Sequence, residues 1–351
     1  MVKLVEACNL ACAYCYQSGR LNAGQVMEDQ TLGRVLAELH RVTSGPASLL
    51  WYGGEPTLVG LGRFSAIVAR ADELFSRRGG VAHSLQTNAV LIDEEWADFL
   101  ACRSFGVSLS LDGPAQLHDA ARPRAGGAGS HAAVERALGC LQRAGLKPRA
   151  ACVVDRHTLD FPELLVDYFH SLGLHEIDFP PALRAGPGGL EARVTALEYG
   201  RFMTRVLDRW LALGQPNFRI RSLAGVVRKL AGLSSSVCKL EGDCSSYVTF
   251  AHNGDVYPCD EFSAFPETRL GNVRESPLDS ILAAPEARTL YSSWAVVPEE
   301  CSDCRWREMC RGSCPFERKM AGGVDRPSIL CDGLKLIFER VDDILRAARK
   351  T

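Results

Sequence analysis

The chain has 351 residues, of which 46% are hydrophobic and 23% are charged, and its formal net charge is −2. These are ordinary values for a globular protein. The small net charge removes the global electrostatic argument for nucleic acid or an anionic membrane as the main partner. No window approaches the roughly 18 consecutive apolar residues of a membrane-spanning helix. The first residues also lack the long apolar core of a signal peptide. We therefore expect a cytoplasmic protein that binds neither nucleic acid nor membrane.

The first 180 residues alternate between predicted strands and predicted helices, which is typical of a parallel sheet with crossover helices. The predicted strands are residues 2–6, 48–52, 82–87, 106–111, 149–154 and 175–179. The predicted helices are residues 30–42, 63–75, 93–102, 131–144 and 161–172. Six units are too few for a closed eight-stranded barrel, so the pattern predicts an α/β fold with a partial (β/α)6 barrel. Its reactive face is expected at the carboxyl ends of the strands.

Gly- and Pro-rich residues 124–130 and 180–189 are predicted to be mobile loops. Helices are predicted at residues 195–213, 223–233 and 333–350, and a hairpin at residues 247–259 with its turn at Asn253-Gly254. We predict a barrel domain at residues 1–190, a helical connector at 191–235, a cysteine-rich domain at 236–335 and a C-terminal helix at 336–351.

Fourteen cysteines are unusual in a chain without an export signal, where thiols stay reduced. Three of them follow the first predicted strand at Cys8, Cys12 and Cys15. Three thiolates on one short loop can hold three irons of a [4Fe–4S] cluster and leave the fourth iron open. A partial zinc site or buried thiols are the alternatives for this triplet. The scattered cysteines lie among apolar residues and are expected to be core thiols: Cys102, Cys140 and Cys152.

The triplet resembles the signature of the radical S-adenosylmethionine (SAM) superfamily, and Gly53-Gly54-Glu55-Pro56 after the second strand is similar to its GGEP motif. The next two predicted strands end at Gln86-Thr87-Asn88 and at Ser110-Leu111-Asp112. In the family, residues at such positions contact the ribose and the carboxylate of the cofactor. The resemblance implies a SAM site formed by Tyr14, Gly53, Gly54, Glu55, Gln86, Ser110, Arg122 and Ile177. The alternatives are an ordinary turn at the glycines and a solvated charge at Arg122.

Eight cysteines in the tail are enough for two complete four-cysteine sites. Residues 301–314 alone could form one zinc knuckle, but that leaves the other tail cysteines without a role. The whole pattern resembles the SPASM domain, a C-terminal extension with two auxiliary clusters. The resemblance implies one cluster on Cys238, Cys244, Cys259 and Cys314. It implies a second on Cys301, Cys304, Cys310 and Cys331.

Asp260 directly follows Cys259. In the anaerobic sulfatase-maturating enzymes, which the chain resembles over almost its whole length, an aspartate at this position is the proposed base. We expect Asp260 on a strand leaving the hairpin, beside the first auxiliary cluster. The run Asp260-Glu261-Phe262 is more similar to ribosomal-peptide maturases. The alternative is that Asp260 only orders the hairpin.

The resemblance implies three [4Fe–4S] clusters and SAM as cofactors, and a 5′-deoxyadenosyl radical that takes a hydrogen atom from a peptide side chain. The leading hypothesis is an enzyme that forms a carbon–carbon or thioether cross-link in a ribosomally made precursor peptide. The second is formylglycine formation on a Cys or Ser of a sulfatase. A non-catalytic electron-transfer protein is the third, but an electron carrier needs neither an open iron nor GGEP. The expected partners are the peptide or protein substrate and an electron donor such as flavodoxin or ferredoxin.

Overall fold

The chain folds into two compact units, each assembled from segments far apart in the sequence. The computed structural model describes residues 1–17, 24–186 and 189–349. The first unit comprises Met1–Leu111, His118–Ala150 and Ser245–Leu290. The second comprises Asp112–Leu117, Ala151–Cys244 and Tyr291–Thr351. The cysteine-rich tail is therefore divided between the two units.

The first unit is built on one sheet with the strand order β6-β5-β4-β1-β12-β13-β14. Its strands are β1 (Val2–Lys3), β4 (Ala47–Tyr52), β5 (Val81–Thr87), β6 (Gly106–Ser110), β12 (Thr249–Phe250), β13 (Asp255–Tyr257) and β14 (Gly271–Asn272). The pairs from β6 to β12 are parallel, and the last two pairs are antiparallel. A second small sheet pairs β2 (Val5–Glu6) with β3 (Gln25–Val26). The carboxyl ends of β1, β4, β5 and β6 consequently meet at one edge.

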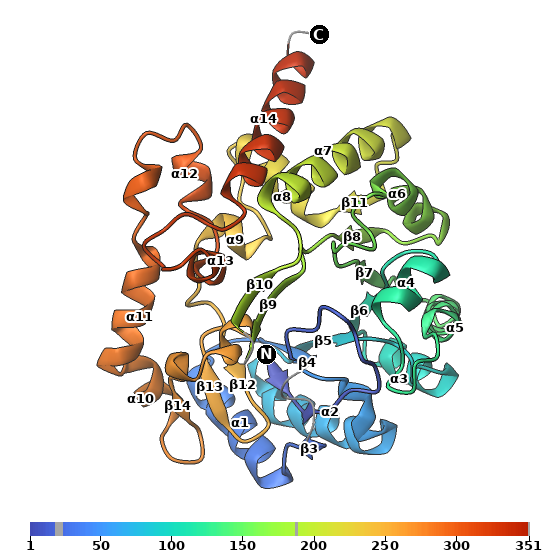
Figure 1. Ribbon diagram of the computed structural model, residues 1–351. Helices are drawn as coiled ribbons and strands as arrows, with labels where there is room; N and C mark the ends of the chain where they lie inside the picture. The colour runs from blue at the N-terminus through green and yellow to red at the C-terminus, as the bar shows by residue number, and fades with distance from the viewer. Residues whose placement is uncertain (18–23, 187–188, 350–351) are drawn as a thin grey trace. The chain divides into compact units, whose positions relative to one another are not determined.

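Helices pack beside this sheet (Figure 1). They are α1 (Asp29–Val42), α2 (Leu61–Phe75), α3 (Glu94–Cys102), α5 (His131–Arg143) and α10 (Leu278–Ala283), with short 3-10 turns η1 (Pro56–Val59), η2 (Ser76–Arg78), η3 (Glu261–Ala264) and η4 (Pro266–Thr268). Most of the residues that α1, α2, α3 and α5 bury are apolar. Trp51 of β4 is fully buried against Phe64 of α2, with ring centroids 5.8 Å apart. Its indole Nε1 donates to Nδ1 of His83 at 3.1 Å, so the buried polar atom is satisfied.

The second unit contains a parallel pair, β8 (Glu176–Asp178) with β11 (Arg219–Ile220), and an antiparallel hairpin, β9 (Leu183–Gly186) with β10 (Gly189–Ala192). Its helices are α6 (Pro162–Ser171), α7 (Ala196–Leu213), α8 (Arg221–Leu230), α9 (Cys238–Glu241), η5 (Glu299–Cys301), α12 (Arg307–Cys310), α13 (Pro315–Met320) and α14 (Cys331–Ala348). Three further elements hold residues of both units: α4 (Ala115–Ala121), β7 (Arg149–Ala151) and α11 (Pro285–Ala295).

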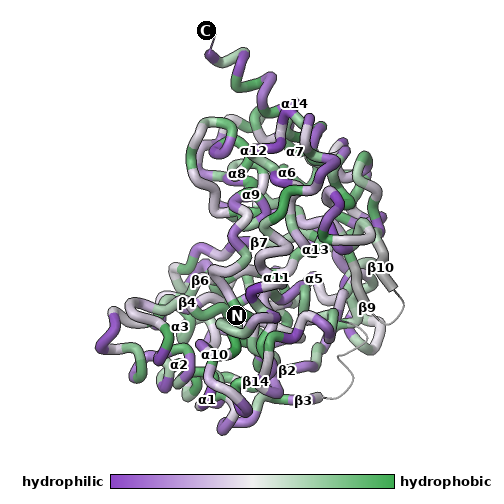
Figure 2. The backbone as a smooth tube through the Cα atoms, turned by 90° about the vertical axis from the view of Figure 1, so that its left-hand side faces the viewer, coloured by the Kyte–Doolittle hydropathy of each residue, from purple (hydrophilic) through white to green (hydrophobic). Residues whose placement is uncertain are grey.

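The helices α7 and α14 approach each other closely at two glycines. A Cβ at Gly333 would lie 1.9 Å from the carbonyl oxygen of Ala196, and a Cβ at Gly200 would lie 2.6 Å from the Cα of Gly333. Along α14, hydrophilic and hydrophobic residues alternate, as expected for a helix with one buried face (Figure 2). The glycine contact fixes the position of α14, whose first residue is Cys331.

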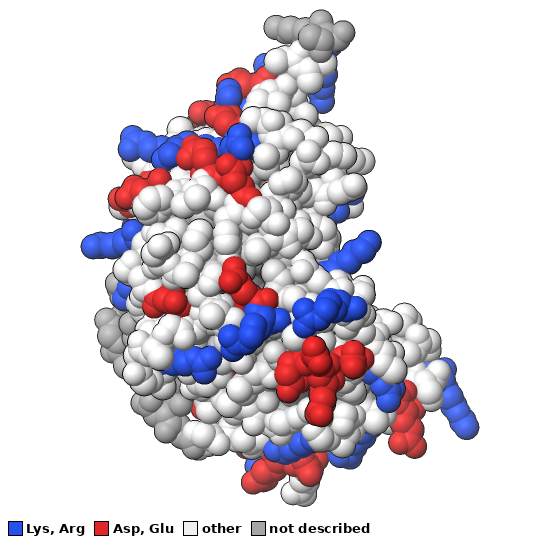
Figure 3. All heavy atoms as spheres, turned by 90° about the vertical axis from the view of Figure 1, so that its right-hand side faces the viewer, with Lys and Arg blue, Asp and Glu red and all other residues white. Residues whose placement is uncertain are grey.

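Charges of both signs are mixed over the face drawn in Figure 3, so no single-sign field covers it. In the second unit, for example, Arg205 pairs with Glu163 and Arg209 pairs with Asp167, each at 2.7 Å. Within the described ranges, no helix is both long and apolar enough to cross a bilayer.

Most of the predicted elements are confirmed with bounds that differ by a few residues, and the hairpin pairs Thr249 with Tyr257 as expected. Three expectations are wrong. Leu4 interrupts the first predicted strand, so that β1 and β2 join different sheets. The predicted loop at residues 180–189 contains β9, and its residues 187–188 lie outside the described ranges. Cys102 is exposed at the end of α3 instead of buried, whereas Cys140 is half-buried and Cys152 is buried.

Candidate functional site

The cysteine triplet lies on the loop that follows β2. The backbone N–H of Ala11 donates to Pro123 O at 2.8 Å, and that of Ala13 donates to Ala121 O at 3.0 Å, which anchors the loop on both sides of Cys12. All three cysteines are half-buried. The loop therefore presents three thiols from one short, fixed segment.

The Cys8 sulfur is surrounded by groups that suit a metal-bound thiolate. It accepts hydrogen bonds from the backbone N–H of Leu10 and from Nδ2 of Asn88, both at 3.5 Å. Burial raises the pKa of the Cys8 thiol, and the nearby charges of Glu55 and Cys15 act in the same direction. A cationic iron site would offset this effect by binding the thiolate form. The environment of Cys8 therefore fits a cluster ligand.

The GGEP segment turns sharply against the cysteine loop. Gly53 and Gly54 have φ of 89° and 51°. A Cβ on Gly54 would lie 2.2 Å from the carbonyl oxygen of Ala7 and 2.9 Å from that of Val5. Only glycine permits this approach of the loop to β2. The turn thus brings Glu55 next to the segment that leads into the cysteine triplet.

Glu55 is 1% exposed and joins the ends of β4 and β5. Its Oε1 accepts from the N–H and hydroxyl of Thr57 and from the hydroxyl of Thr87, and its Oε2 accepts from the N–H of Asn88, all at 2.7 to 3.0 Å. Burial raises the pKa of Glu55, and these hydrogen bonds partly offset that rise. A bound ammonium group would favour the charged form further. Glu55 therefore fits a cation-binding role but also organises the strand ends.

The other residues predicted to contact SAM lie in smaller groups. Nε2 of Gln86 donates to the Ser110 hydroxyl at 3.3 Å, which links the ends of β5 and β6. The guanidinium of Arg122 lies over the ring of Tyr14, 5.2 Å from its centroid, and both side chains are buried. Ile177 is fully buried on β8 and belongs to the second unit.

Asp260 is a buried carboxylate held by an ammonium group. It stands at the N-terminal end of η3 with helical backbone angles, so the expectation that it lies on a strand is wrong, because β13 already ends at Tyr257. Its Oδ1 lies 2.7 Å from Nζ of Lys3, and the two side chains are 9% and 3% exposed. Nζ of Lys3 also donates to the Ser263 hydroxyl at 3.0 Å. Lys3 thus neutralises the charge of Asp260 in a buried setting.

Two tyrosines connect Asp260 to the GGEP segment. The Tyr16 hydroxyl donates to Oδ2 of Asp260 and lies 3.0 Å from the Tyr52 hydroxyl. Nε2 of Gln17 donates to Tyr16 at 2.6 Å, and Oε1 of Gln17 accepts from the N–H of Gly54 at 3.0 Å. Burial, followed by the charge of Asp260, raises the pKa of both tyrosines far above its ordinary value. Both phenols therefore remain neutral O–H donors at physiological pH.

Sequence reasoning missed Lys3, Tyr16, Gln17 and Tyr52. A signal was present, because Tyr16 and Gln17 directly follow Cys15 and Tyr52 directly precedes Gly53. Residues that flank two motifs meeting at one sheet edge are candidates for the same site.

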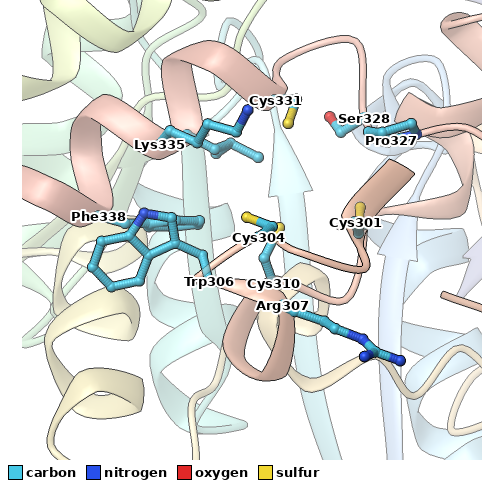
Figure 4. Close-up of a pocket in the computed structure, with 12 residues that line it drawn as sticks. Cys301, Cys304, Trp306, Arg307, Cys310, Pro327, Ser328, Cys331, Lys335 and Phe338 are labelled. Carbon is cyan, nitrogen blue, oxygen red and sulfur yellow. The ribbon is translucent and has the colours of Figure 1, made fainter. Parts of the chain in front are cut away.

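In the second unit, four cysteines surround one cavity with an empty volume of about 330 Å³ (Figure 4). They are the four predicted ligands of one auxiliary cluster, Cys301, Cys304, Cys310 and Cys331. Trp306, Lys335 and Phe338 also line this cavity. Burial raises the pKa of Cys310 to about 12, with a smaller contribution from Cys331, so a bound cluster would replace a tightly held proton. This donor set fits a four-cysteine iron–sulfur cluster.

The predicted ligands of the other auxiliary cluster are divided between the units. Cys238, Cys244 and Cys314 belong to the second unit, and Cys259 belongs to the first. Burial and then the charge of Cys238 raise the pKa of Cys244 to about 11. Within the described part of the chain, no three His, Cys, Asp or Glu side chains have the arrangement of a single-metal site.

Comparisons with known proteins show which families this chain resembles. Residues 2–163 match the family described as the radical SAM superfamily, and residues 242–305 match SPASM, described as an iron-sulfur cluster-binding domain. The serine-type anaerobic sulfatase-maturating enzyme of Bacteroides thetaiotaomicron is 28% identical over 97% of this chain and 88% of its own length. The cysteine-type anaerobic sulfatase-maturating enzyme of Clostridium perfringens is 28% identical over 95% of this chain and 93% of its own.

A solved structure described as native anSMEcpe with bound AdoMet and Kp18Cys peptide covers 100% of this chain and 99% of its own, with 27% identity and a TM-score of 0.90. Streptococcus suis SuiB bound to precursor peptide SuiA covers 93% of this chain and 73% of its own, with a TM-score of 0.67. At 18% identity, that likeness shows the fold alone.

The chain is therefore a radical SAM enzyme with a C-terminal SPASM domain. It is homologous to the anaerobic sulfatase-maturating enzymes. The predicted fold class, a partial α/β barrel followed by a SPASM domain, is confirmed. The four-part domain division and the assignment of individual ligands stay predictions.

Proposed function

We propose that this enzyme oxidises a Cys or Ser side chain in a peptide segment of its substrate to formylglycine. The observation that carries the proposal is the buried carboxylate of Asp260, paired with Lys3 and hydrogen-bonded to Tyr16. The serine-type and cysteine-type maturating enzymes, which align over 88% and 93% of their own lengths, support it. Cross-linking of a precursor peptide, the leading hypothesis from the sequence, is the second candidate, and the run Asp260-Glu261-Phe262 favours it.

The proposed cofactors are SAM and three [4Fe–4S] clusters. The residues that would hold the first cluster are Cys8, Cys12 and Cys15. The two auxiliary clusters would use the two sets of four tail cysteines. When bound, these groups supply a carbon radical that removes a hydrogen atom and an acceptor for one electron. The GGEP segment and Glu55 bind the charged end of SAM, and the buried Tyr14 and Arg122 line its site.

Asp260 acts as the base in the second half of the reaction. After the Cβ atom has lost a hydrogen atom, Asp260 takes the proton from the substrate hydroxyl or thiol. An auxiliary cluster held by the tail cysteines would supply the acceptor for the one electron that also leaves the substrate. A Ser side chain thereby becomes the aldehyde directly. A Cys side chain becomes a thioaldehyde, which water converts to the aldehyde and hydrogen sulfide. Lys3 and the Tyr16 hydroxyl fix the two oxygens of Asp260 during the transfer.

The test uses anaerobically reconstituted enzyme with matched sulfatase-derived peptides that carry Cys, Ser or Ala at the target position. Mass spectrometry after labelling with a hydrazide detects the aldehyde. We expect labelled product from the Cys or Ser peptide and none from the Ala peptide. A precursor peptide that loses two hydrogens, forms no hydrazone and resists fragmentation between two residues would instead support the cross-linking candidate. The cytoplasmic location and the flavodoxin or ferredoxin donor stay predictions.

A further inference from the structure

Arg318 is a large charged side chain buried in the second unit. It lies on the short helix α13, and its backbone N–H donates to the carbonyl oxygen of Cys314 at 3.0 Å. Arg318 is only 1% exposed and ranks among the largest fully buried side chains. Burying a guanidinium is costly unless nearby negative charge or hydrogen-bond acceptors compensate it. Its surroundings must therefore explain why it is there.

The direct contacts of Arg318 are neutral and incomplete. Nη1 donates to Trp294 O at 3.0 Å, and Nη2 donates to Val296 O at 2.7 Å. Its Nε is buried without a hydrogen-bond partner among the described residues. No carboxylate of the described ranges lies within ion-pair distance of Arg318. The guanidinium thus keeps an unused donor and forms no direct ion pair with a described carboxylate.

Cysteines of both predicted auxiliary sets lie near Arg318, and a bound cluster would hold them as thiolates. Burial lowers the pKa of Arg318, and the groups that act against this are Cys301, Asp325, Cys314 and Cys244. Cys301 belongs to the set around the cavity, whereas Cys314 and Cys244 belong to the other. Gly312 lines the cavity, and a Cβ added to Gly312 would lie 3.7 Å from Cδ of Arg318. Arg318 therefore lies beside ligands of both sets.

We propose that Arg318 is a positioning residue for electron transfer, whose buried positive charge raises the reduction potentials of both auxiliary clusters. The inference rests on the proposed cofactor set. A nearby cation in a medium of low dielectric favours the state that holds one more electron, and hydrogen bonds to cluster sulfur act in the same direction. The clusters would then accept more readily the electron that the substrate radical loses.

A purely structural role is the competing explanation, because the guanidinium also holds the carbonyl groups at Trp294 and Val296. Arg318→Met removes the charge and the hydrogen bonds, whereas Arg318→Lys keeps the charge. Arg209→Met is the matched control, since it removes the same charge from a half-exposed ion pair with Asp167. Water and salt screen a charge at that exposed site.

The experiment is a potentiometric titration followed by electron paramagnetic resonance, on the full reconstituted chain with Cys8, Cys12 and Cys15 replaced by Ala, so that only the auxiliary clusters titrate. We expect Arg318→Met to shift both potentials to more negative values at unchanged iron content. Arg318→Lys should shift both potentials much less than Arg318→Met does. Arg209→Met should leave both potentials at their parent values. Parent potentials in an Arg318→Met protein with full iron would overturn the inference. Loss of iron from both the Met and the Lys variants would also overturn it, in favour of a structural role. A parent protein without reducible clusters would overturn the proposed cofactor set as well.

Discussion

The two units organise their functional residues differently. In the first, charged and polar side chains bind one another: Asp260 is paired with Lys3, and Glu55 accepts four hydrogen bonds from Thr57, Thr87 and Asn88. In the second, four cysteines line an open volume of about 330 Å³, and the buried Arg318 has one donor unused. The network around Asp260 and Glu55 in the first unit is preorganised by its own hydrogen bonds, whereas the four cysteines and Arg318 of the second unit present groups that a bound cluster would engage.

The largest expected effect comes from removing the proposed cluster ligands of the first unit. Replacing Cys8, Cys12 and Cys15 together with Ala should abolish cleavage of SAM, because no other thiols are proposed for the open cluster. Iron should fall from about twelve to about eight per chain, since each cubane contains four. Iron analysis and chromatography of 5′-deoxyadenosine check this. Undiminished cleavage in the triple variant would show that the reactive cluster lies elsewhere.

The second-largest expected effect distinguishes the function of the second unit from that of the first. Cys304→Ala removes a ligand from the cavity of the second unit and should stop product formation, because the substrate radical loses its electron acceptor. Deoxyadenosine should still form when a chemical reductant is supplied. Cys102→Ala is the matched control, because this exposed cysteine belongs to neither set. A normal product yield from Cys304→Ala would mean that the cluster in this cavity is only structural.

Asp260→Asn tests the hydrogen-bonded network of the first unit. The substitution keeps the shape of the side chain and removes its basicity, so product formation should fall by about two to four orders of magnitude. Deoxyadenosine formation should persist. Asp255→Asn provides the control, because it removes a carboxylate of β13 that pairs with Arg269 and not with Lys3. If Asp260→Asn forms product at the parent rate with unchanged iron, Asp260 only orders the hairpin.

The smallest effect is on the stability of the second unit. Gly333→Ala places a Cβ against the backbone of Ala196 and should lower the free energy of unfolding by about 1 to 3 kcal/mol, as overpacking usually does. Because α14 also carries Cys331, iron at the cavity should bind less tightly. Gly62→Ala in α2 meets no atom within 4 Å and should not destabilise the protein. Urea titrations of both variants measure the difference, and equal stabilities would contradict the described helix contact.

The local elements of this fold were predictable because their signals are local. Hydrophobic periodicity predicted the helices, and Asn253-Gly254 predicted the hairpin of β12 and β13. β9 was missed because its stability comes from pairing with β10 across a Gly-rich connection and not from its own residues. Cys102 was misplaced because periodicity does not determine the exposure of a residue at the end of a helix.

The candidate site was predictable only in part. The cysteine spacings and the GGEP motif are recognisable in the sequence. Their proximity was predictable because the carboxyl ends of parallel strands lie at one edge of the sheet. The link from Gly54 through Gln17 and Tyr16 to Asp260 was not predictable, because it joins residues more than two hundred positions apart. The burial of Lys3 also depends on the carboxylate that compensates it, and β1 alone does not reveal that partner.

The most direct test of the central claim uses a peptide whose target Cys or Ser carries deuterium at Cβ. If the enzyme removes a hydrogen atom from that carbon, one deuterium should appear in 5′-deoxyadenosine, and an aldehyde should appear at the same residue. Mass spectrometry of the nucleoside and the peptide reads both outcomes in one reaction. Deoxyadenosine without deuterium, alongside an aldehyde product, would contradict hydrogen abstraction at Cβ. Deuterated deoxyadenosine with a cross-link and no aldehyde would contradict the proposed formylglycine product.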